Sequence, residues 1–304
     1  MKIVVIGASG FVGKNLCDAL IKNKQNDIVC LSKNGINETE NLRSIIGTFE
    51  DQELINKLLY KADLVYHLVS GSIPSSSWDN PWIEIEGNLI PTLHLIESCA
   101  AHHVKKIVFV SSAGTVYGKS DQMLDENATT APFSPYGIIK NTIENFLRFA
   151  FEKYQIHYDI FRVSNIYGEG QNIKKGLGII NIVLDKILNN EEIQIFGDGK
   201  NVKNYIYIQD VVYFLQDVVN RNLDDNQIYN LSSDQYASIL DIIQLAEKIS
   251  GAKARINFIE SKKSDNQFIQ LDHSKLMQAY PEFSFTSLEA GMRKTWEVLL
   301  ESGK

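Results

Sequence analysis

The sequence has little cysteine, no excess of positive charge and no long apolar run. Its three cysteines among 304 residues are Cys17, Cys30 and Cys99, each within an apolar pattern. An odd number does not suit a disulfide framework, so we expect reduced core residues and a cytoplasmic protein. The formal net charge of -7 excludes a broadly basic surface, and we expect no nucleic-acid or membrane partner.

Metal-binding and membrane-spanning patterns are also missing. The six histidines have no metal-ligand spacing, and the adjacent His102 and His103 would point apart on a helix. No apolar run is long enough to cross a bilayer. Residues 1–6 are apolar but are followed at once by glycines, so we expect no signal peptide there. We therefore expect no metal site.

What the sequence does contain is a regular alternation of apolar runs and amphipathic stretches. The runs of Val, Ile and Leu that are typical of buried parallel strands are residues 2–6, 28–31, 64–69, 107–111 and 158–162. The helical patterns are residues 12–22, 53–59, 82–101 and 136–154, with a kink expected at Pro91. This alternation predicts an α/β fold, a doubly wound Rossmann parallel sheet with a smaller α/β substrate-binding lobe.

The rhythm changes after Tyr167, which suggests a division into two domains. We predict a dinucleotide-binding Rossmann domain over residues 1–168, with 203–227 returning to it. Residues 169–202 and 228–304 are predicted to form the substrate-binding lobe.

A glycine-rich turn follows the first apolar run and opens the first helical pattern. It reads Gly7-Ala8-Ser9-Gly10-Phe11-Val12-Gly13. Glycines allow a tight turn and close approach of a pyrophosphate, and the helix N-terminus supplies amide donors. The alternative is a strand–helix turn without a ligand. We expect Gly7, Ser9, Gly10, Phe11, Val12 and Gly13 to bind a dinucleotide, together with Leu68 at the end of the third run.

The end of the second apolar run bears on the choice of dinucleotide. NAD enzymes usually place an acid there, on the adenosine ribose, whereas this chain has Ser32 and Lys33. A hydroxyl and a lysine suit a ribose 2′-phosphate, which favours NADP with NAD as the alternative. Lys33 as a solvated loop lysine is the other interpretation.

Tyr136 and Lys140 open the fourth helical pattern four residues apart, which puts both side chains on one face. A nearby ammonium and an oxidised nicotinamide both favour the phenolate, so we expect a lowered tyrosine pKa. Tyr136 would then exchange a proton with a carbinol while Lys140 holds the nicotinamide ribose. Taken alone, such a pair is usually only helix surface.

With these motifs the sequence resembles the extended short-chain dehydrogenase/reductase family of nucleotide-sugar epimerases, dehydratases and reductases, over nearly the whole chain. Further matching segments are residues 110–118, 162–168, 196–199, 205–210 and 271–275. The resemblance implies that Asn165 binds the substrate diphosphate and that Phe196 lies near the nucleobase. Lys203 and Lys262 stand where the family has arginines on the phosphates, and Lys262 is paired by spacing with Asp265.

Departures from the family pattern narrow the reaction. The usual serine or threonine that bonds the reacting oxygen is Ala113 here, and either Ser112 or Thr115 could replace it. The family's 4,6-dehydratases have an acid pair at the positions of Gly114 and Thr115. The GDP-fucose-synthase type has a cysteine at Thr115 and a histidine near Gly170. Both sets are absent, which disfavours dehydration and 3,5-epimerisation and leaves chemistry at one carbinol, carbon 4.

Three functions remain open on this sequence. The first choice is an NADPH-dependent reductase of a dTDP- or UDP-4-keto-6-deoxyhexose, favoured by Ser32 and Lys33. The second is a UDP-hexose 4-epimerase with tightly bound NAD. The third is a non-catalytic dinucleotide-sensing regulator, to which Ala113 gives some support. Apolar residues on more than one face of the helical patterns at 88–101 and 136–154 predict a homodimer through these helices.

Overall fold

The computed structural model describes residues 1–70, 74–173, 176–221, 223, 225–260 and 269–302. The chain divides into two compact units. Unit 1 comprises Met1–Gly118, Glu126–Val163 and Val212–Asn230, and unit 2 comprises Lys119–Asp125, Ser164–Val211 and Leu231–Lys304.

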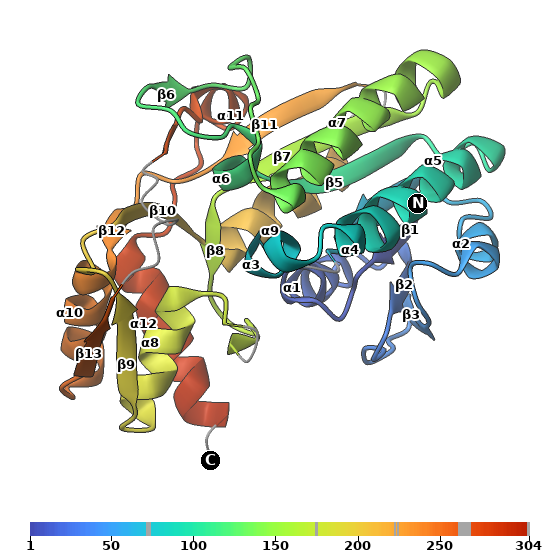
Figure 1. Cartoon of the computed structure of the whole chain (residues 1–304). Coiled ribbons are helices and arrows are strands. Elements are labelled where there is room, and N and C mark those ends of the chain that lie inside the picture. Colours follow the sequence, from blue (N-terminus) through green and yellow to red (C-terminus); the bar gives the residue numbers. More distant parts are fainter. Residues whose placement is uncertain (71–73, 174–175, 222, 224, 261–268, 303–304) are drawn as a thin grey trace. The chain divides into compact units, whose positions relative to one another are not determined.

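Unit 1 is built on a seven-stranded sheet in the order β11-β7-β5-β4-β1-β2-β3 (Figure 1). The strands are β1 (Lys2–Ile6), β2 (Asp27–Ser32), β3 (Leu42–Ile46), β4 (Leu64–His67), β5 (Lys106–Ser112), β7 (His157–Val163) and β11 (Gln227–Leu231). The pairs β1–β2, β2–β3, β1–β4, β4–β5 and β5–β7 are all parallel. This sheet confirms the predicted Rossmann-type α/β fold. β3, with a mixed rather than continuously apolar sequence, was not among the predicted strands.

Helices cover both faces of this sheet. They are α1 (Phe11–Leu20), α2 (Gln52–Leu58), α3 (Pro74–Asp79), α4 (Trp82–Glu84), the π-helical η1 (Ile85–Leu89), α5 (Ile90–Ala101), α6 (Ala113–Val116), α7 (Pro135–Tyr154), α9 (Ile208–Asp217) and the 3₁₀ turn η3 (Val218–Asn220). Alternate strand residues such as Val4 and Ile6 pack with α2, α5 and α7 in one apolar core. On the opposite face, the Tyr66 hydroxyl donates to the Leu215 carbonyl of α9. Successive side chains of a strand point to opposite faces of the sheet, so neighbouring residues such as Val65 and Tyr66 contact helices on opposite faces.

The helical pattern at 82–101 contains a π-helical turn where a proline kink was expected. Residues Ile85–Leu89 form η1, and Pro91 falls in the first turn of α5. The backbone is helical before Pro91 as well, since the Ile90 amide donates to the Ile85 carbonyl, so the widened turn comes just before a residue that has no amide to donate. Widened turns of this kind are frequent at functional sites.

Unit 2 contains three small sheets and four helices in the part of the chain that the structure describes. The sheets are β12-β10-β8, β13-β9 and β14-β6. The strands are β6 (Met123–Leu124), β8 (Asn165–Tyr167), β9 (Glu192–Phe196), β10 (Val202–Tyr207), β12 (Tyr236–Ser238), β13 (Arg255–Ile259) and β14 (Gln270–Leu271). The helices are α8 (Ile179–Leu188), α10 (Ile239–Ser250), α11 (Ser274–Ala279) and α12 (Leu288–Ser302).

The return to unit 1 begins later than the sequence indicated. Residues 203–211 were expected to rejoin the Rossmann domain, but β10 pairs with β8 and β12, and unit 1 resumes only at Val212. The backbone hydrogen bonds of β10 to these two strands account for the difference. The substrate-binding role of this part of the chain stays a prediction.

Candidate active site

The glycines of the turn after β1 allow it to pack closely on neighbouring backbone, where a side chain would not fit. Gly7 has φ +93°, and a Cβ there would lie 3.0 Å from the Leu68 carbonyl carbon of the loop after β4. A Cβ on Gly13 would overlap the Gly7 carbonyl oxygen and lie 2.8 Å from the Cα of Ala8. β1 lies between β2 and β4 in the sheet, so the strand order reverses beside it. Rossmann folds bind dinucleotides at such a switch point, outside the carboxyl ends of the strands.

The first turn of α1 leaves donors for an anion. Its N-cap is Gly10, with no side-chain cap, and the amides of a first helical turn have no intrahelical partner. Ser9 is exposed beside them, while Phe11 and Val12 are half-buried. A pyrophosphate fits this cradle, because the amides and the helix dipole both favour negative charge.

The end of β2 carries a buried hydroxyl and an exposed lysine. Ser32 is 5% exposed, and its Oγ has no hydrogen-bond partner among the described residues. Lys33 is exposed. A buried hydroxyl without a partner is costly, so Ser32 is suited to a bound polar group such as a ribose hydroxyl.

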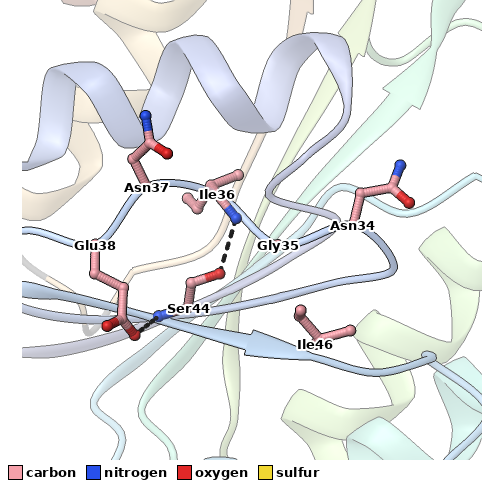
Figure 2. A pocket seen from close by; sticks show the side chains of 7 residues that line it. All are labelled: Asn34, Gly35, Ile36, Asn37, Glu38, Ser44 and Ile46. Atoms are coloured by element: carbon pink, nitrogen blue, oxygen red, sulfur yellow. Dashed lines mark hydrogen bonds between the residues drawn. The ribbon is translucent and has the colours of Figure 1, made fainter.

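A hollow of about 440 Å³ opens directly after these residues (Figure 2). Its lining residues are Asn34, Gly35, Ile36, Asn37, Glu38, Ser44 and Ile46. The Glu38 carboxylate accepts a 2.9 Å hydrogen bond from the Ser44 amide, and Figure 2 shows Asn34 at the other end of the hollow. No acid follows directly at the end of β2, where Ser32 and Lys33 stand. Glu38 comes six residues later, but the turn into β3 brings it back to the same edge.

Tyr136 and Lys140 lie on one face of α7, as predicted. Ser134 caps this helix, because its Oγ accepts a 3.1 Å hydrogen bond from the Gly137 amide. The Lys140 Nζ lies 5.6 Å from the centre of the Tyr136 ring and donates to the Val110 carbonyl at 3.0 Å. The bond to Val110 fixes the ammonium at the end of β5, beside the phenol.

Burial controls both pKa values in the unliganded chain. It raises the pKa of Tyr136 to about 12, with a hydrogen bond from Ser70 lowering it and the charge of Glu84 raising it. It lowers the pKa of Lys140 to about 8, against the charges of Glu84 and Glu144. We expected a lowered tyrosine pKa. The neighbouring ammonium alone does not offset burial, so the phenol is protonated at neutral pH unless a bound cation adds to the field.

The two hydroxyls proposed to replace Ala113 differ in their surroundings. Ala113 is fully buried at the start of α6. Thr115 is half-buried, and its Oγ1 donates to the Ser112 carbonyl at 3.3 Å. Ser112 ends β5 and is also half-buried. Ser112 and Thr115 lie in the same turn, and the catalytic role of either one stays a prediction.

A buried polar network that the sequence did not predict lies beside this pair. The Thr92 hydroxyl donates to the Asn88 carbonyl at 2.6 Å and therefore accepts the 2.8 Å bond from His67 Nε2. Asn88 Nδ2 donates to Glu84 at 2.9 Å. Burial and the charge of Lys140 lower the pKa of His67 to about 3, so this imidazole is neutral. The available indication was a carboxylate and an amide, Glu84 and Asn88, at the helical spacing that puts them on the same face as Leu95 and Cys99.

A second buried network connects α7 to the strands β5 and β7. The Arg162 guanidinium forms an ion pair with Glu144 at 2.7 Å and donates to the Tyr117 hydroxyl at 2.9 Å. Ser111 donates to the same carboxylate at 2.6 Å. These bonds join β5, β7 and α7 one helical turn after Lys140.

The residues expected to bind substrate lie in unit 2. Asn165 is exposed on β8, and its Nδ2 donates to the Asn204 carbonyl at 2.8 Å. Phe196 ends β9 with 64% of its surface exposed, and Lys203 is half-buried on β10, opposite Ala237. Lys262 and Asp265 lie outside the described residues. The structure thus places Asn165 and Lys203 in one small sheet and Phe196 in another.

Within the described ranges, no three His, Cys, Asp or Glu residues are grouped so that they could hold a metal ion. The same ranges contain no helix long and apolar enough to span a bilayer. All three cysteines are free and buried, and the sulfurs of Cys17 and Cys30 are 3.4 Å apart.

The chain is similar in sequence to known nucleotide-sugar epimerases and reductases. Residues 3–232 match the family described as the NAD dependent epimerase/dehydratase family. A Methanocaldococcus jannaschii protein named for UDP-glucose 4-epimerase activity is 30% identical over 281 residues, 90% of each chain. The dTDP-4-dehydro-6-deoxyglucose reductase of Escherichia coli is 28% identical over 99% of this chain and 94% of its own length.

Solved structures of nucleotide-sugar epimerases are also similar to this chain. The Thermotoga maritima UDP-glucose 4-epimerase with UDP-glucose has a TM-score of 0.90 and 28% identity over the whole of both chains. The Bacillus cereus UDP-glucuronic acid 4-epimerase with UDP-glucuronic acid and NAD has a TM-score of 0.90 and 26% identity, over 99% of this chain and all of its own.

The family match covers well over half of the chain, and the Rossmann sheet with its Tyr136–Lys140 pair agrees with it. These findings set aside the regulator hypothesis. The chain belongs to the NAD dependent epimerase/dehydratase family, the nucleotide-sugar epimerases, dehydratases and reductases of the extended short-chain dehydrogenase/reductase type, and it is an enzyme of that family.

Proposed function

We propose that this enzyme is a UDP-hexose 4-epimerase that uses NAD. The observation that carries the proposal is a single acid–base pair, Tyr136 with Lys140, at the carboxyl end of the Rossmann sheet. The turn at Gly114 and Thr115 has no carboxylate to move a second proton. The similarity to 4-epimerases favours this function over the reductase that the sequence alone suggested.

The residues divide the chemistry as follows. When bound, the nicotinamide supplies the acceptor and donor of the hydride. Tyr136 takes the proton of the carbon-4 hydroxyl and returns it to the keto oxygen after the sugar has turned over. Lys140 holds positive charge beside the phenol, and Ser112 or Thr115 bonds the reacting oxygen. Because each proton that leaves comes back, no net acid or base is consumed.

NAD rather than NADP is the proposed cofactor. A ribose 2′-phosphate carries close to two negative charges, and the Glu38 carboxylate in the hollow after β2 opposes it. Ser32 can bond a free ribose hydroxyl. The related Bacillus cereus epimerase has NAD in its structure.

The test is to identify the dinucleotide and the reaction together. We expect protein purified without added cofactor to release NAD on denaturation, identified by mass spectrometry. We also expect it to interconvert UDP-glucose and UDP-galactose without consuming added dinucleotide. Stoichiometric consumption of NADPH with a 4-keto sugar nucleotide, and no interconversion, would refute the epimerase.

The second candidate is the NADPH-dependent 4-ketoreductase, which Ser32 and Lys33 favour. A charge-assisted hydrogen bond to a 2′-phosphate contributes about 1.5–3 kcal/mol, which corresponds to a preference for NADPH of roughly tenfold to a hundredfold. Lys33→Asp should reverse such a preference. If the protein prefers NAD and Lys33→Asp changes its affinity little, Lys33 is a solvated loop residue.

A further inference from the structure

The two elements that carry the proposed catalytic groups meet at one tight contact. Thr115 lies in α6, and Tyr136 lies in the first turn of α7. A Cβ on Gly137, next to Tyr136, would overlap the Thr115 carbonyl oxygen and lie 3.1 Å from the Thr115 Cβ. The glycine therefore lets the two elements touch. Because α6 is a single turn, Ala113–Val116, it is not stable by itself, and other contacts must fix its position on α7.

The buried guanidinium of Arg162 on β7 is bonded to both of these elements. Arg162 is 1% exposed and lies opposite Ser111 in the sheet register. Its Nη1 donates at 2.9 Å to the hydroxyl of Tyr117, the C-cap residue of α6. Its Nε and Nη2 both donate to the Glu144 carboxylate of α7, Nη2 at 2.7 Å. One side chain thus connects the end of α6 to α7.

On the α7 side, further bonds fix the helix along the end of β5. Ser111 Oγ donates to the Glu144 carboxylate at 2.6 Å, and the carbonyl of the preceding residue, Val110, accepts from Lys140 Nζ at 3.0 Å. Lys140 and Glu144 are one helical turn apart, so α7 is held to β5 at two successive turns. The position of α7 therefore does not depend on Tyr117.

On the α6 side, the Tyr117 phenol makes the directional contacts. Its hydroxyl accepts from Arg162 and donates to Asn230 Oδ1 of β11 at 2.6 Å, and the Arg162 Cζ lies 4.8 Å from the centre of its ring. Ala113 and Val116 of α6 are buried as well. Apolar burial is non-directional, whereas a hydrogen bond fixes a distance and an angle, so the bonds of Tyr117 determine where α6 stands.

We propose that Arg162 is a positioning residue that acts through Tyr117 and Glu144. It sets the distance between the Tyr136 phenol and the hydroxyls of residues 112–115. The proposal rests on the proposed function, in which one of these hydroxyls bonds the reacting oxygen while Tyr136 moves its proton. All three guanidinium nitrogens of Arg162 are bonded to protein groups, so it acts without touching substrate or cofactor. A planar fork that holds two groups at once is a property of arginine and not of lysine.

Tyr117→Phe tests the α6 side of this connection. The variant keeps the ring and the Arg162–Glu144 pair, and the Arg162 Nη1 keeps its 3.3 Å bond to the Glu126 carbonyl. With the nucleotide sugar that the wild type converts, kcat should fall about tenfold, because a displacement of 1 Å near the reacting atoms can cost about a hundredfold. KM and the affinity for NAD should stay within about twofold, since the lost alignment matters only in the transition state.

The matched control is Tyr66→Phe. Tyr66 is also fully buried in the sheet, and its hydroxyl donates to the Leu215 carbonyl at 2.7 Å on the face opposite α7. This variant loses a phenolic hydrogen bond of similar length and should keep the wild-type kcat. An equal loss of kcat in both variants would show that any lost buried bond lowers turnover, and it would overturn the proposal. An unchanged kcat in Tyr117→Phe would also overturn it.

A protein without the hydroxyls separates positioning from a general loss of structure. In the double variant Ser112→Ala/Thr115→Val, adding Tyr117→Phe should lower kcat by less than about twofold, because no hydroxyl is left to misplace. A further loss of about tenfold in that background would be additive and would refute positioning. Arg162→Lys keeps the charge without the fork and should lower kcat at least as much as Tyr117→Phe. Wild-type kcat in Arg162→Lys would overturn the role of Arg162, and if that variant does not fold, Tyr117→Phe still decides.

Hydrogen exchange follows α6 without turnover and separates this proposal from the proposed function. In the unliganded protein, the amides of residues 113–117 should exchange faster in Tyr117→Phe than in the wild type, and at the wild-type rate in Tyr66→Phe. Faster exchange in a protein that converts no nucleotide sugar would support the placement of α6 by this network and refute the epimerase. Unchanged exchange and unchanged kcat in an active epimerase would refute the positioning role alone.

Discussion

Gly13→Ala tests whether the glycine turn is built for a dinucleotide. The added Cβ would overlap the Gly7 carbonyl oxygen and lie 2.8 Å from Ala8 Cα and 3.0 Å from the Ala8 carbonyl oxygen. All three atoms are backbone, so no side-chain rotation can relieve the contact, and the turn itself must move. Inserting a methyl group into a packed site of this kind costs about 1–3 kcal/mol.

The consequence divides between stability and binding. The melting temperature should fall by about 2–4 °C for each kcal/mol lost. If the moved turn no longer presents its amides to the pyrophosphate, the same 1–3 kcal/mol weakens dinucleotide binding by about 5- to 150-fold. Isothermal titration calorimetry with NAD and differential scanning calorimetry of the unliganded protein measure the two parts.

The matched control is Gly87→Ala, because a Cβ on Gly87 would have no atom within 4 Å. It should bind NAD like the wild type and melt at a similar temperature. If Gly13→Ala also kept wild-type affinity and melting temperature, the close packing at this turn would have no role in cofactor binding, and the reasoning would be refuted.

Three further predictions concern the pair and the assembly. Tyr136→Phe should reduce turnover by about 10²- to 10⁴-fold while NAD still binds, and near-normal turnover would exclude the phenol as the proton carrier. Since the pKa of Lys140 is about 8, the protonated fraction falls as the pH rises through 8, so the initial rate should drop about fiftyfold between pH 8 and pH 10 if the ammonium is required. We expect α7 and α5 of two copies to pack together through their apolar surfaces in a two-fold homodimer. Light scattering should therefore give a dimer for the wild type and a monomer for Phe149→Asp, which replaces a side chain that is 48% exposed. A wild-type monomer at micromolar concentration would contradict the dimer.

Local sequence was sufficient for much of unit 1. The apolar runs at 2–6, 28–31 and 107–111 became β1, β2 and β5, because strands covered on both faces need apolar side chains at every position. β3 was missed for the converse reason. It lies at the edge of the sheet, where Arg43 and Ser44 need not be buried, so its sequence lacks that pattern.

The spacing of Tyr136 and Lys140 determined their shared helix face, since residues four apart on a helix are neighbours whatever surrounds them. Their ionisation depended on tertiary structure. Burial opposes both charged forms, and the charge of Glu84 comes from a group that packing brings near them, whereas Glu144 follows Lys140 by four residues on α7.

The sequence by itself predicted the strands of the Rossmann sheet, the glycine turn and the shared face of Tyr136 and Lys140, because each has a pattern within a short stretch of the chain. Only the tertiary structure decided which distant groups meet them. Glu38 reaches the hollow after β2 because β3 pairs beside β2, and Glu84 reaches the surroundings of Lys140 because α4 packs on α7. Such meetings depend on the burial of many side chains at once, and no short pattern in the chain encodes them.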